Sequence, residues 1–132
     1  MNRLLVSAAS FAMAFAAFAP AVAQAQELRP IMVQNNCYKS IRLWIRHADG
    51  WRNWHNHGHF VFAGNERALY LTDNGVRLSQ RTDHSLYFYA EAINGTGTWH
   101  GTIPVNVNGY ILQMREANYS LQYGAYQILL TC

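Results

Sequence analysis

Three histidines at alternate positions, His55, His57 and His59, are the residues of this sequence whose type and spacing point most directly to chemistry. Imidazole nitrogen is a common ligand of zinc and copper. On an extended strand these side chains share one face, with neighbours about 6.6 Å apart and the outer pair about 13 Å apart, so only an i,i+2 pair can chelate one ion. A three-histidine site therefore requires a bend at Gly58 or a ligand from elsewhere in the chain. The histidines that could supply this ligand are His47, His84 and His100.

The histidine segment has two interpretations that the sequence leaves open. In the first, it is the water-facing side of a hairpin whose other face buries Trp54, Phe60 and Phe62, and no cofactor is bound. In the second, the protein is a periplasmic zinc- or copper-binding protein. The ligands of that metal site would be His55, His57, His59 and His100.

Arg42, Trp44 and Arg46 alternate with three apolar residues, so on a strand they share the face opposite to the core. A tryptophan between two arginines can stack on a sugar or another planar group while the guanidinium groups bind a carboxylate or a phosphate. Trp51 and Trp54 follow in the adjoining segment and complete a predicted ligand-binding surface. In the other arrangement, a second sheet or a loop covers Trp44, and the aliphatic stems of the arginines lie over it.

The sequence carries none of the motifs that identify common hydrolases, kinases or metalloproteases. Its carboxylates stand singly and mostly beside turns, where they usually bond to the backbone. Glu91 is the exception, because it lies in an apolar segment and comes near His100 across a turn if residues 86–93 pair with residues 99–105. A Glu–His couple could serve acid–base catalysis in a small secreted hydrolase or toxin. We predict no catalytic residues and keep this activity as a second alternative.

Cys37 and Cys132 are the two cysteines of the chain. In an exported protein, two cysteines most simply form one disulfide. The bond would close a loop of about 95 residues, and on the chain-entropy account it stabilises the fold by about 4 to 5 kcal/mol. It requires the first and last strands of the domain to be neighbours.

The N-terminal segment has the composition of a secretory signal peptide. Arg3 is the only charge before Glu27, and the apolar run over residues 4–19 is short for a membrane span of about 20 residues. We predict a cleaved signal peptide over residues 1–25 and a single domain over residues 26–132, in the periplasm or outside the cell. The net charge of +3 for the whole chain is too small to indicate nucleic acid as a partner.

Short alternating apolar segments separated by Gly, Asn and Asp indicate an all-β domain. Residues 39–47 give the clearest alternation, and residues 86–93, which are apolar on both faces, fit a central strand covered on both sides. Asn108 and Gly109 are a strong two-residue turn signal, and only residues 114–118 could form a helical turn. About eight short strands predict an antiparallel β-sandwich or partly closed barrel, with one disulfide joining the first and last strands.

Several short motifs resemble a known family. They are NNC at residues 35–37 followed by an alternating strand, a tryptophan-rich turn that ends in Phe62, Gly64 and Glu66, YFYAE at residues 87–91, and Trp99 with Gly101. Together they resemble the small exported proteobacterial proteins of the domain of unknown function 1036 family. The resemblance covers nearly the whole mature chain, and it implies an exported domain but no reaction.

Together these features predict an exported, non-enzymatic β-sandwich protein that binds a ligand or partner in the cell envelope. The expected partner is an envelope protein or a glycan. We expect the domain to be a monomer without a membrane span.

Overall fold

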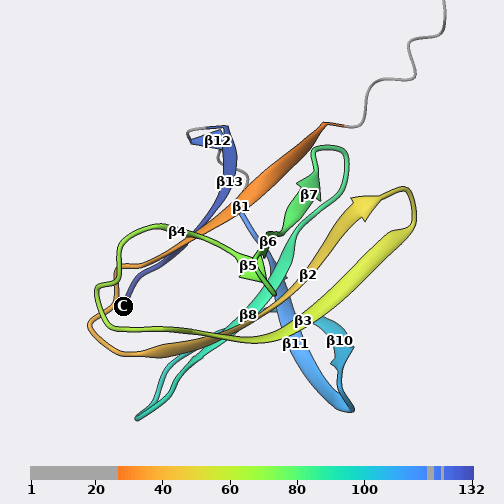
Figure 1. Cartoon of the computed structure of the whole chain (residues 1–132). Coiled ribbons are helices and arrows are strands. Elements are labelled where there is room, and N and C mark those ends of the chain that lie inside the picture. The colour runs from red at the N-terminus through yellow and green to blue at the C-terminus, as the bar shows by residue number, and fades with distance from the viewer. Residues whose placement is uncertain (1–26, 119–120, 123) are drawn as a thin grey trace, which may run out of the picture.

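The computed structural model describes residues 27–118, 121–122 and 124–132, and every regular element among them is a β-strand (Figure 1). The predicted signal peptide, residues 1–25, lies outside the described residues. None of the described elements is a helix long and apolar enough to cross a membrane. In chain order the strands are β1 (Leu28–Asn35), β2 (Ile41–Gly50), β3 (Asn53–Phe62), β4 (Leu69–Tyr70), β5 (Thr72–Asp73), β6 (Val76–Arg77), β7 (Ser79–Arg81), β8 (Tyr87–Ala92), β9 (Thr98–Trp99), β10 (Ile103–Val107), β11 (Tyr110–Glu116), β12 (Leu121–Gln122) and β13 (Ala125–Leu130).

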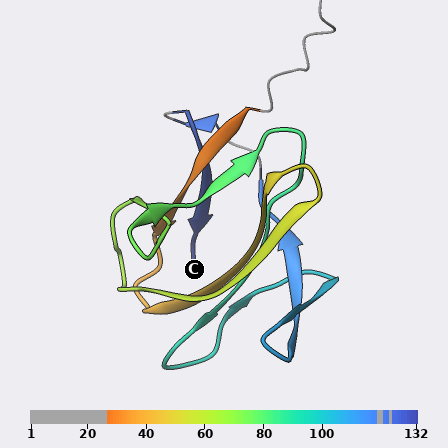
Figure 2. The same cartoon turned by 45° about the vertical axis from the view of Figure 1, so that its right-hand side comes forward.

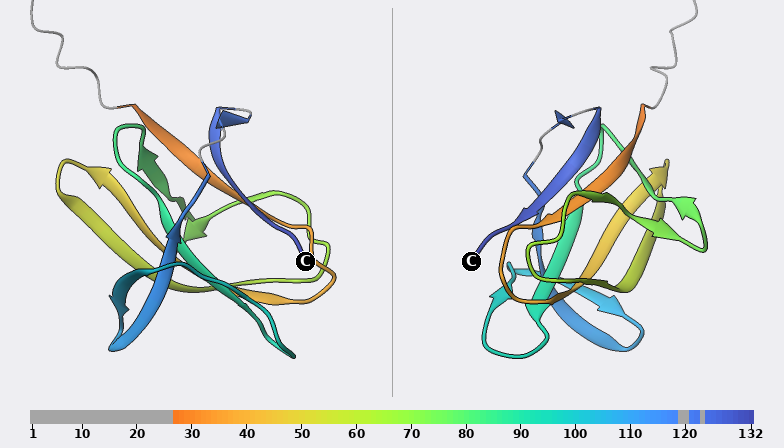
Figure 3. Two further views of the ribbon diagram at one scale, coloured as in Figure 1. Left: turned by 180° about the vertical axis from the view of Figure 1, so that it is seen from behind. Right: turned by 60° about the vertical axis from the view of Figure 1, so that its left-hand side comes forward.

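The strands form two sheets and a small separate hairpin, β5–β6. One sheet has the order β12-β13-β1-β4, with β7 also paired to β1, and the larger sheet has the order β10-β11-β8-β2-β3, with β9 paired to β8. The larger sheet curls like part of a barrel, and the smaller sheet faces its concave side (Figure 2 and Figure 3). The predicted all-β fold of mainly antiparallel strands is confirmed. The strands outnumber the eight or so predicted because several of them are only two residues long.

The first and last strands lie side by side and run parallel, with residues 31–35 opposite residues 126–130. Cys37 follows β1 and Cys132 follows β13, and the two form a disulfide with their Cα atoms 5.0 Å apart. This confirms the predicted disulfide and the neighbouring positions of the two strands. A disulfide indicates that the protein folds in an oxidising compartment.

The alternation in β2 and β8 explains which side chains the two sheets enclose. Every second residue from Ile41 to Ile45 is buried, and so is every second residue from Phe88 to Ala92, as expected for strands with one face on a core. The buried residues of this main core include Ile31, Val33, Ile41, Leu43, Ile45, Phe88, Ala90, Ile128 and Leu130. The outer cluster, on the other face of the larger sheet, consists of Val105, Val107 and Met114 packed with Trp44, Tyr87, Tyr89 and Leu112. β8 is therefore covered on both faces, as predicted for residues 86–93.

The turn between β10 and β11 forms at residues that readily adopt positive φ angles. Asn108 and Gly109, at φ 51° and 90°, form the predicted two-residue connection. Residues 114–118, the only segment that could have formed a helical turn, do not form one, because β11 continues to Glu116 and pairs with β10 on one side and with β8 on the other. Backbone groups that are bonded to neighbouring strands are no longer available for helical hydrogen bonds.

Asn35 holds the turn that carries Cys37. Its side chain is fully buried, and its amide nitrogen donates to the carbonyl oxygens of Lys39 and Ala63, both at 2.8 Å. Its amide oxygen accepts from the backbone N–H of Cys37 at 3.0 Å. These bonds compensate the cost of burying the amide, so the polar residue is compatible with the core.

Candidate functional site

Arg42, Trp44 and Arg46 lie on the outer face of β2, as predicted, but they do not form one open surface. The alternation of β2 directs all three away from the main core. Arg42 is paired with Glu91 on β8, with Nη1 and Oε1 3.4 Å apart. Arg46 donates to the side-chain oxygen of Asn56 at 3.0 Å, and no carboxylate among the described residues lies within ion-pair distance of it. Arg46 is therefore the arginine of this face that keeps an unpaired charge.

Trp44 is covered by the β10–β11 hairpin. It is half-buried and packs in the outer cluster. The centroid of its ring lies 5.6 Å from that of Tyr89 and 5.4 Å from that of His59. On the β3 side the ring rests directly on Gly58, where an added Cβ would overlap the indole. Trp44 is thus covered, as in one of the two expected arrangements, but by the β10–β11 hairpin of its own sheet, and Arg46 lies over Trp54 instead of Trp44.

A cleft opens where β3 and β10, the two edges of the curled sheet, approach each other. It has a volume of about 510 Å³. Trp54 and Tyr87 form aromatic walls with ring centroids 6.1 Å apart, and the guanidinium carbon of Arg46 lies 4.7 Å from the centre of the Trp54 ring. The remaining lining residues are Asn56, Ile103, Pro104, Val105 and Asn106. We call this hollow the Trp54 cleft.

Trp51 lies at the turn between β2 and β3, and it does not line the Trp54 cleft. Its side chain is 65% exposed. The centroid of the His84 ring is 5.7 Å from that of Trp51 and 5.4 Å from that of Trp54. The two predicted tryptophans therefore belong to one aromatic row, and of these two only Trp54 borders the cleft.

A β-bulge in β3 at Gly58 divides the three alternating histidines. The register of β3 against β2 shifts by one residue at this point, so the alternation of the two faces is broken. His55 and His57 stay on the inner face, in ring contact with the buried His47. His59 lies on the outer face, beside the indole of β2. The bend that the sequence allowed is present, and it moves one histidine away from the other two.

The expected hairpin, with the histidines on one face and three apolar residues on the other, is wrong in part. Trp54 lies on the face opposite to His55, as expected, and lines the cleft. Phe60 and Phe62 follow the bulge and return to the inner face. Phe62 is buried in the main core, and the Phe60 ring is 6.3 Å from that of His57. A strict period of two cannot be continued across a bulge.

His47 lies between His55 and His57 and is in ring contact with both. The sequence identified it only as one of three histidines that could supply an additional ligand. His47 is 2% exposed, and its Nδ1 lies 2.6 Å from the carbonyl oxygen of Ser79. Burial lowers the pKa of His47 because it penalises the charged imidazolium; the bond to Ser79 opposes this shift, and the neighbouring His57 and His55 add to it. His47 occupies the inner-face position that follows Ile45, and this alternation is the signal that could have identified it.

Glu91 and His100 are not brought together as an acid–base couple. The expected pairing of residues 86–93 with residues 99–105 is present only in part, because β8 pairs with β9 at residues 98–99, whereas residues 103–107 pair with β11. The Glu91 carboxylate is paired with Arg42 and accepts a hydrogen bond from the Tyr89 hydroxyl at 3.2 Å. His100 is exposed, and its Nδ1 is 2.9 Å from the Thr98 hydroxyl. The two side chains therefore have different partners.

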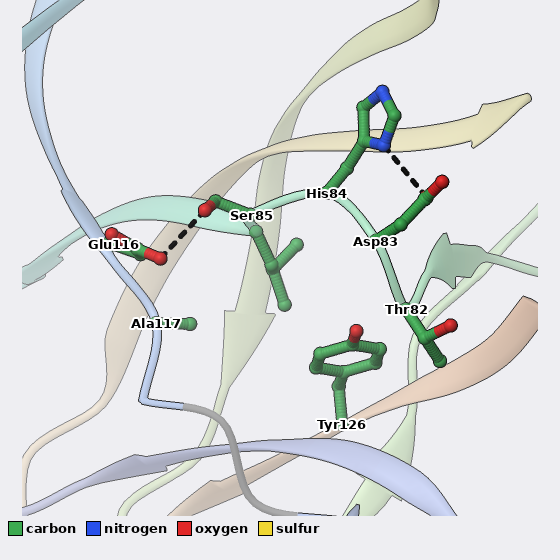
Figure 4. Close-up of a pocket in the computed structure, with 8 residues that line it drawn as sticks. Thr82, Asp83, His84, Ser85, Glu116, Ala117 and Tyr126 are labelled. Carbon is green, nitrogen blue, oxygen red and sulfur yellow. Dashed lines mark hydrogen bonds and ion pairs between the residues drawn. The ribbon is translucent and has the colours of Figure 1, made fainter. Parts of the chain in front are cut away.

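A second hollow, of about 240 Å³, contains an acid, a histidine and a serine in succession (Figure 4). The Nδ1 atom of His84 lies 2.8 Å from the Asp83 carboxylate, whereas the Ser85 hydroxyl turns away and donates to Glu116 at 2.6 Å. A serine nucleophile needs the histidine as its base. Here the serine is bonded to another residue, so the three do not form a relay.

The ionisation of Asp83 makes the stability of the fold depend on pH in the acid range. Arg81, whose side chain is 2% exposed, donates to both oxygens of Asp83, at 2.7 and 2.5 Å. These bonds, together with the smaller effect of His84, hold the pKa of Asp83 well below its ordinary value of 3.8. Because the pKa is lower in the folded state than in the unfolded state, Asp83 stabilises the fold above its unfolded pKa, and this contribution is lost as the pH falls.

We expect Asp83→Asn to unfold at a lower temperature than the wild type at neutral pH. The difference between the two melting temperatures should shrink as the pH falls below about 4, because protonation then removes the same charge from the wild type. Circular dichroism melts over this range measure the effect. A difference that stays constant with pH would show that the Asp83 charge is not its origin.

Comparison of the chain with protein-family models, with curated proteins and with solved structures finds no match. The resemblance to the domain of unknown function 1036 family stays a prediction.

Proposed function

We propose that the protein is an exported, non-enzymatic binding protein of the cell envelope that holds an acidic glycan in the Trp54 cleft. The observation that carries the proposal is the Arg46 guanidinium, which lies against Trp54 and has no carboxylate partner among the described residues. A free cation held on an aromatic ring favours a ligand with a negative charge and a flat apolar face. A sugar that carries a carboxylate has both properties.

The size and lining of the cleft support a ligand of this kind. Its volume of about 510 Å³ lies within the range of about 300 to 1,000 Å³ that is typical of ligand pockets. Trp54, Tyr87 and Ile103 supply apolar walls, and Arg46 and Asn56 supply polar groups at one side. Polar and apolar groups line the cleft in similar measure, which suits a sugar better than a purely apolar ligand.

The disulfide supports folding in an oxidising compartment, and the predicted signal peptide supports export. Acidic glycans of the envelope are ligands that an exported protein meets. An envelope protein is the other class of partner expected from the sequence, and the experiment below distinguishes the two.

Titration calorimetry with two matched sugars tests the proposal. Fragments made of N-acetylglucosamine and N-acetylmuramic acid carry a lactyl carboxylate, and chitin oligosaccharides of equal length have the same backbone without it. We expect the wild type to bind the acidic sugar more tightly. Trp54→Ala should weaken the binding of both sugars about tenfold or more, since a buried aromatic contact of this kind is usually worth 2 kcal/mol or so. Arg46→Gln should remove the preference for the acidic sugar.

Arg42→Gln is the matched control, because Arg42 lies on the same face of β2 but is paired with Glu91 and does not line the cleft. It should bind both sugars as the wild type does. If neither sugar binds, or if a folded Trp54→Ala protein binds them unchanged, the glycan proposal is wrong. Capture of an envelope protein that requires Trp54 would then favour the other class of partner.

A further inference from the structure

Three imidazoles meet on the inner face of the β2–β3 hairpin, on the opposite side of the sheet from the Trp54 cleft. His47 on β2 pairs with His55 on β3, and His57 is the next inner residue of β3. The ring centroids are 5.3 Å apart for His47 and His55, 5.0 Å for His47 and His57, and 6.1 Å for His55 and His57. An i,i+2 pair on one strand and a third histidine on its neighbour thus form a compact triangle.

His47 is held in the tautomer that a metal ion binds. Its Nδ1 donates to the Ser79 carbonyl, since a carbonyl oxygen can only accept. Its Nε2 therefore carries a lone pair, and this atom is buried without a hydrogen-bond partner among the described residues. A buried polar atom without a partner costs free energy, and a bound cation would supply the missing partner.

The other two histidines are also bonded through one ring nitrogen, in their case to a carboxylate. His55 Nε2 lies 2.9 Å from Asp49, and His57 Nδ1 lies 3.3 Å from Asp73. Histidines that bind metals usually donate their second ring N–H to a carbonyl or carboxylate in this way, which fixes the tautomer and strengthens the free nitrogen as a ligand. Two carboxylates beside the group also make the position favourable for a cation.

Two of the three ring separations match those of imidazoles that share one ion. With a zinc–nitrogen distance of 2.0 to 2.1 Å, a ring centre lies about 3.2 Å from the metal, and two rings at a tetrahedral angle have centres about 5 Å apart. The separations of 5.0 and 5.3 Å agree with this value, whereas the separation of 6.1 Å between His55 and His57 is too long for it and must shorten when an ion binds. The strands β2 and β3 therefore bring the three rings close enough for a shared ion, but the rings still have to turn toward it.

We propose that His47, His55 and His57 bind a divalent transition-metal ion of the zinc type. As the side chains stand, no group of three or more His, Cys, Asp or Glu residues in the described part of the chain is arranged to hold a metal ion. The rings of His55 and His57 must therefore turn, and the side chains of Asp49 and Asp73 must follow them, until the free ring nitrogens point at the ion bound by Nε2 of His47. The side chains of His55 and His57 are 39% and 23% exposed and their carboxylate partners are partly exposed, so this rotation requires no movement of the main core.

The proposed ligand set differs from the one expected from the sequence. His59 lies on the other face of β3, beyond the bulge. His100 is exposed and bonded to Thr98. His47 takes the third position, and the site is independent of the proposed glycan cleft.

Titration of the chelator-treated protein with zinc, copper and nickel salts tests this site. We expect one zinc ion per chain, with a dissociation constant below about a micromolar. The His55→Ala/His57→Ala protein should bind zinc at least a hundredfold more weakly. Asp73→Asn should weaken binding about 10- to 100-fold, because the carboxylate no longer orients the His57 ring.

His59→Ala and His100→Ala are the matched controls, and they should bind zinc as the wild type does. A His47 variant could unfold the core, so the role of His47 is tested by nitrogen NMR of the histidine rings in the wild type. Zinc should shift the resonance of His47 Nε2. An unshifted resonance would show that His47 is not a ligand. Binding only at millimolar zinc, or unchanged binding by a folded His55→Ala/His57→Ala protein, would overturn the proposal. So would an equal loss in His59→Ala.

Discussion

The Cys37→Ser/Cys132→Ser protein should lose about 4 to 5 kcal/mol of unfolding free energy, which is a large part of the 5 to 15 kcal/mol or so of an ordinary domain. The two cysteines are 95 residues apart in the sequence, and closing so long a loop strongly restricts the unfolded chain. The folded state should change little, because residues 31–35 remain paired with residues 126–130 and Asn35 continues to hold the turn.

Urea denaturation measures this effect. The midpoint should fall, and the slope of free energy against urea should rise because the open chain exposes more surface on unfolding. Wild-type protein with its disulfide reduced is the matched control and should behave as the double variant does. A loss below about 1 kcal/mol would mean that the unfolded chain is already compact without the bond.

Met114→Ala should give the second largest effect, a loss of about 2 to 5 kcal/mol, because it leaves a cavity at a fully buried position. Met114 is 0% exposed and projects from β11 into the outer cluster, which also contains the indole of Trp44. Val105 belongs to the same cluster and also lines the Trp54 cleft. The variant should therefore loosen the hairpin, and it should weaken binding of the proposed glycan in the cleft as well as stability.

Two control substitutions in β11 distinguish the loss of the buried Met114 side chain from a general sensitivity of this strand to mutation. Gln113→Ala alters the exposed neighbour on the same strand and should change stability by less than about 0.5 kcal/mol. Met114→Leu conserves most of the volume and should cost less than about 1.5 kcal/mol. Tryptophan fluorescence of Met114→Ala should shift as water reaches Trp44. If Met114→Ala is no less stable than Gln113→Ala, the outer cluster does not belong to the cooperative core.

The local parts of the fold could be predicted because they are encoded by neighbouring residues. The alternation of residues 39–47 and the turn at Asn108 and Gly109 were both correct, since side-chain period and φ preference depend on few residues. The disulfide was predictable from the number of cysteines. The disulfide also predicted that the first and last strands are neighbours, but their parallel direction was not predicted, because the number of cysteines does not determine the direction of the strands that they join.

The candidate site was harder to predict, because it depends on a bulge and on distant elements. An extended segment with strict alternation would have placed all three histidines on one face, and the extra residue at Gly58 moves His59 to the other. Whether Trp44 is open or covered depends on a hairpin more than fifty residues away in the sequence. The burial of His47 could have been predicted, because a histidine that continues the buried side of an apolar strand is expected to be enclosed.

A chain that leaves the ribosome or crosses a membrane from its N-terminus presents β1 long before β13. In its sheet β1 pairs with β4 and β7 along one edge and with β13 along the other, so the second edge stays open until residues 125–130 arrive. Open strand edges pair readily with other chains. The period of greatest risk of aggregation is therefore the interval between the synthesis of the first and last strands, when a holding chaperone would be of most use and no disulfide can yet form.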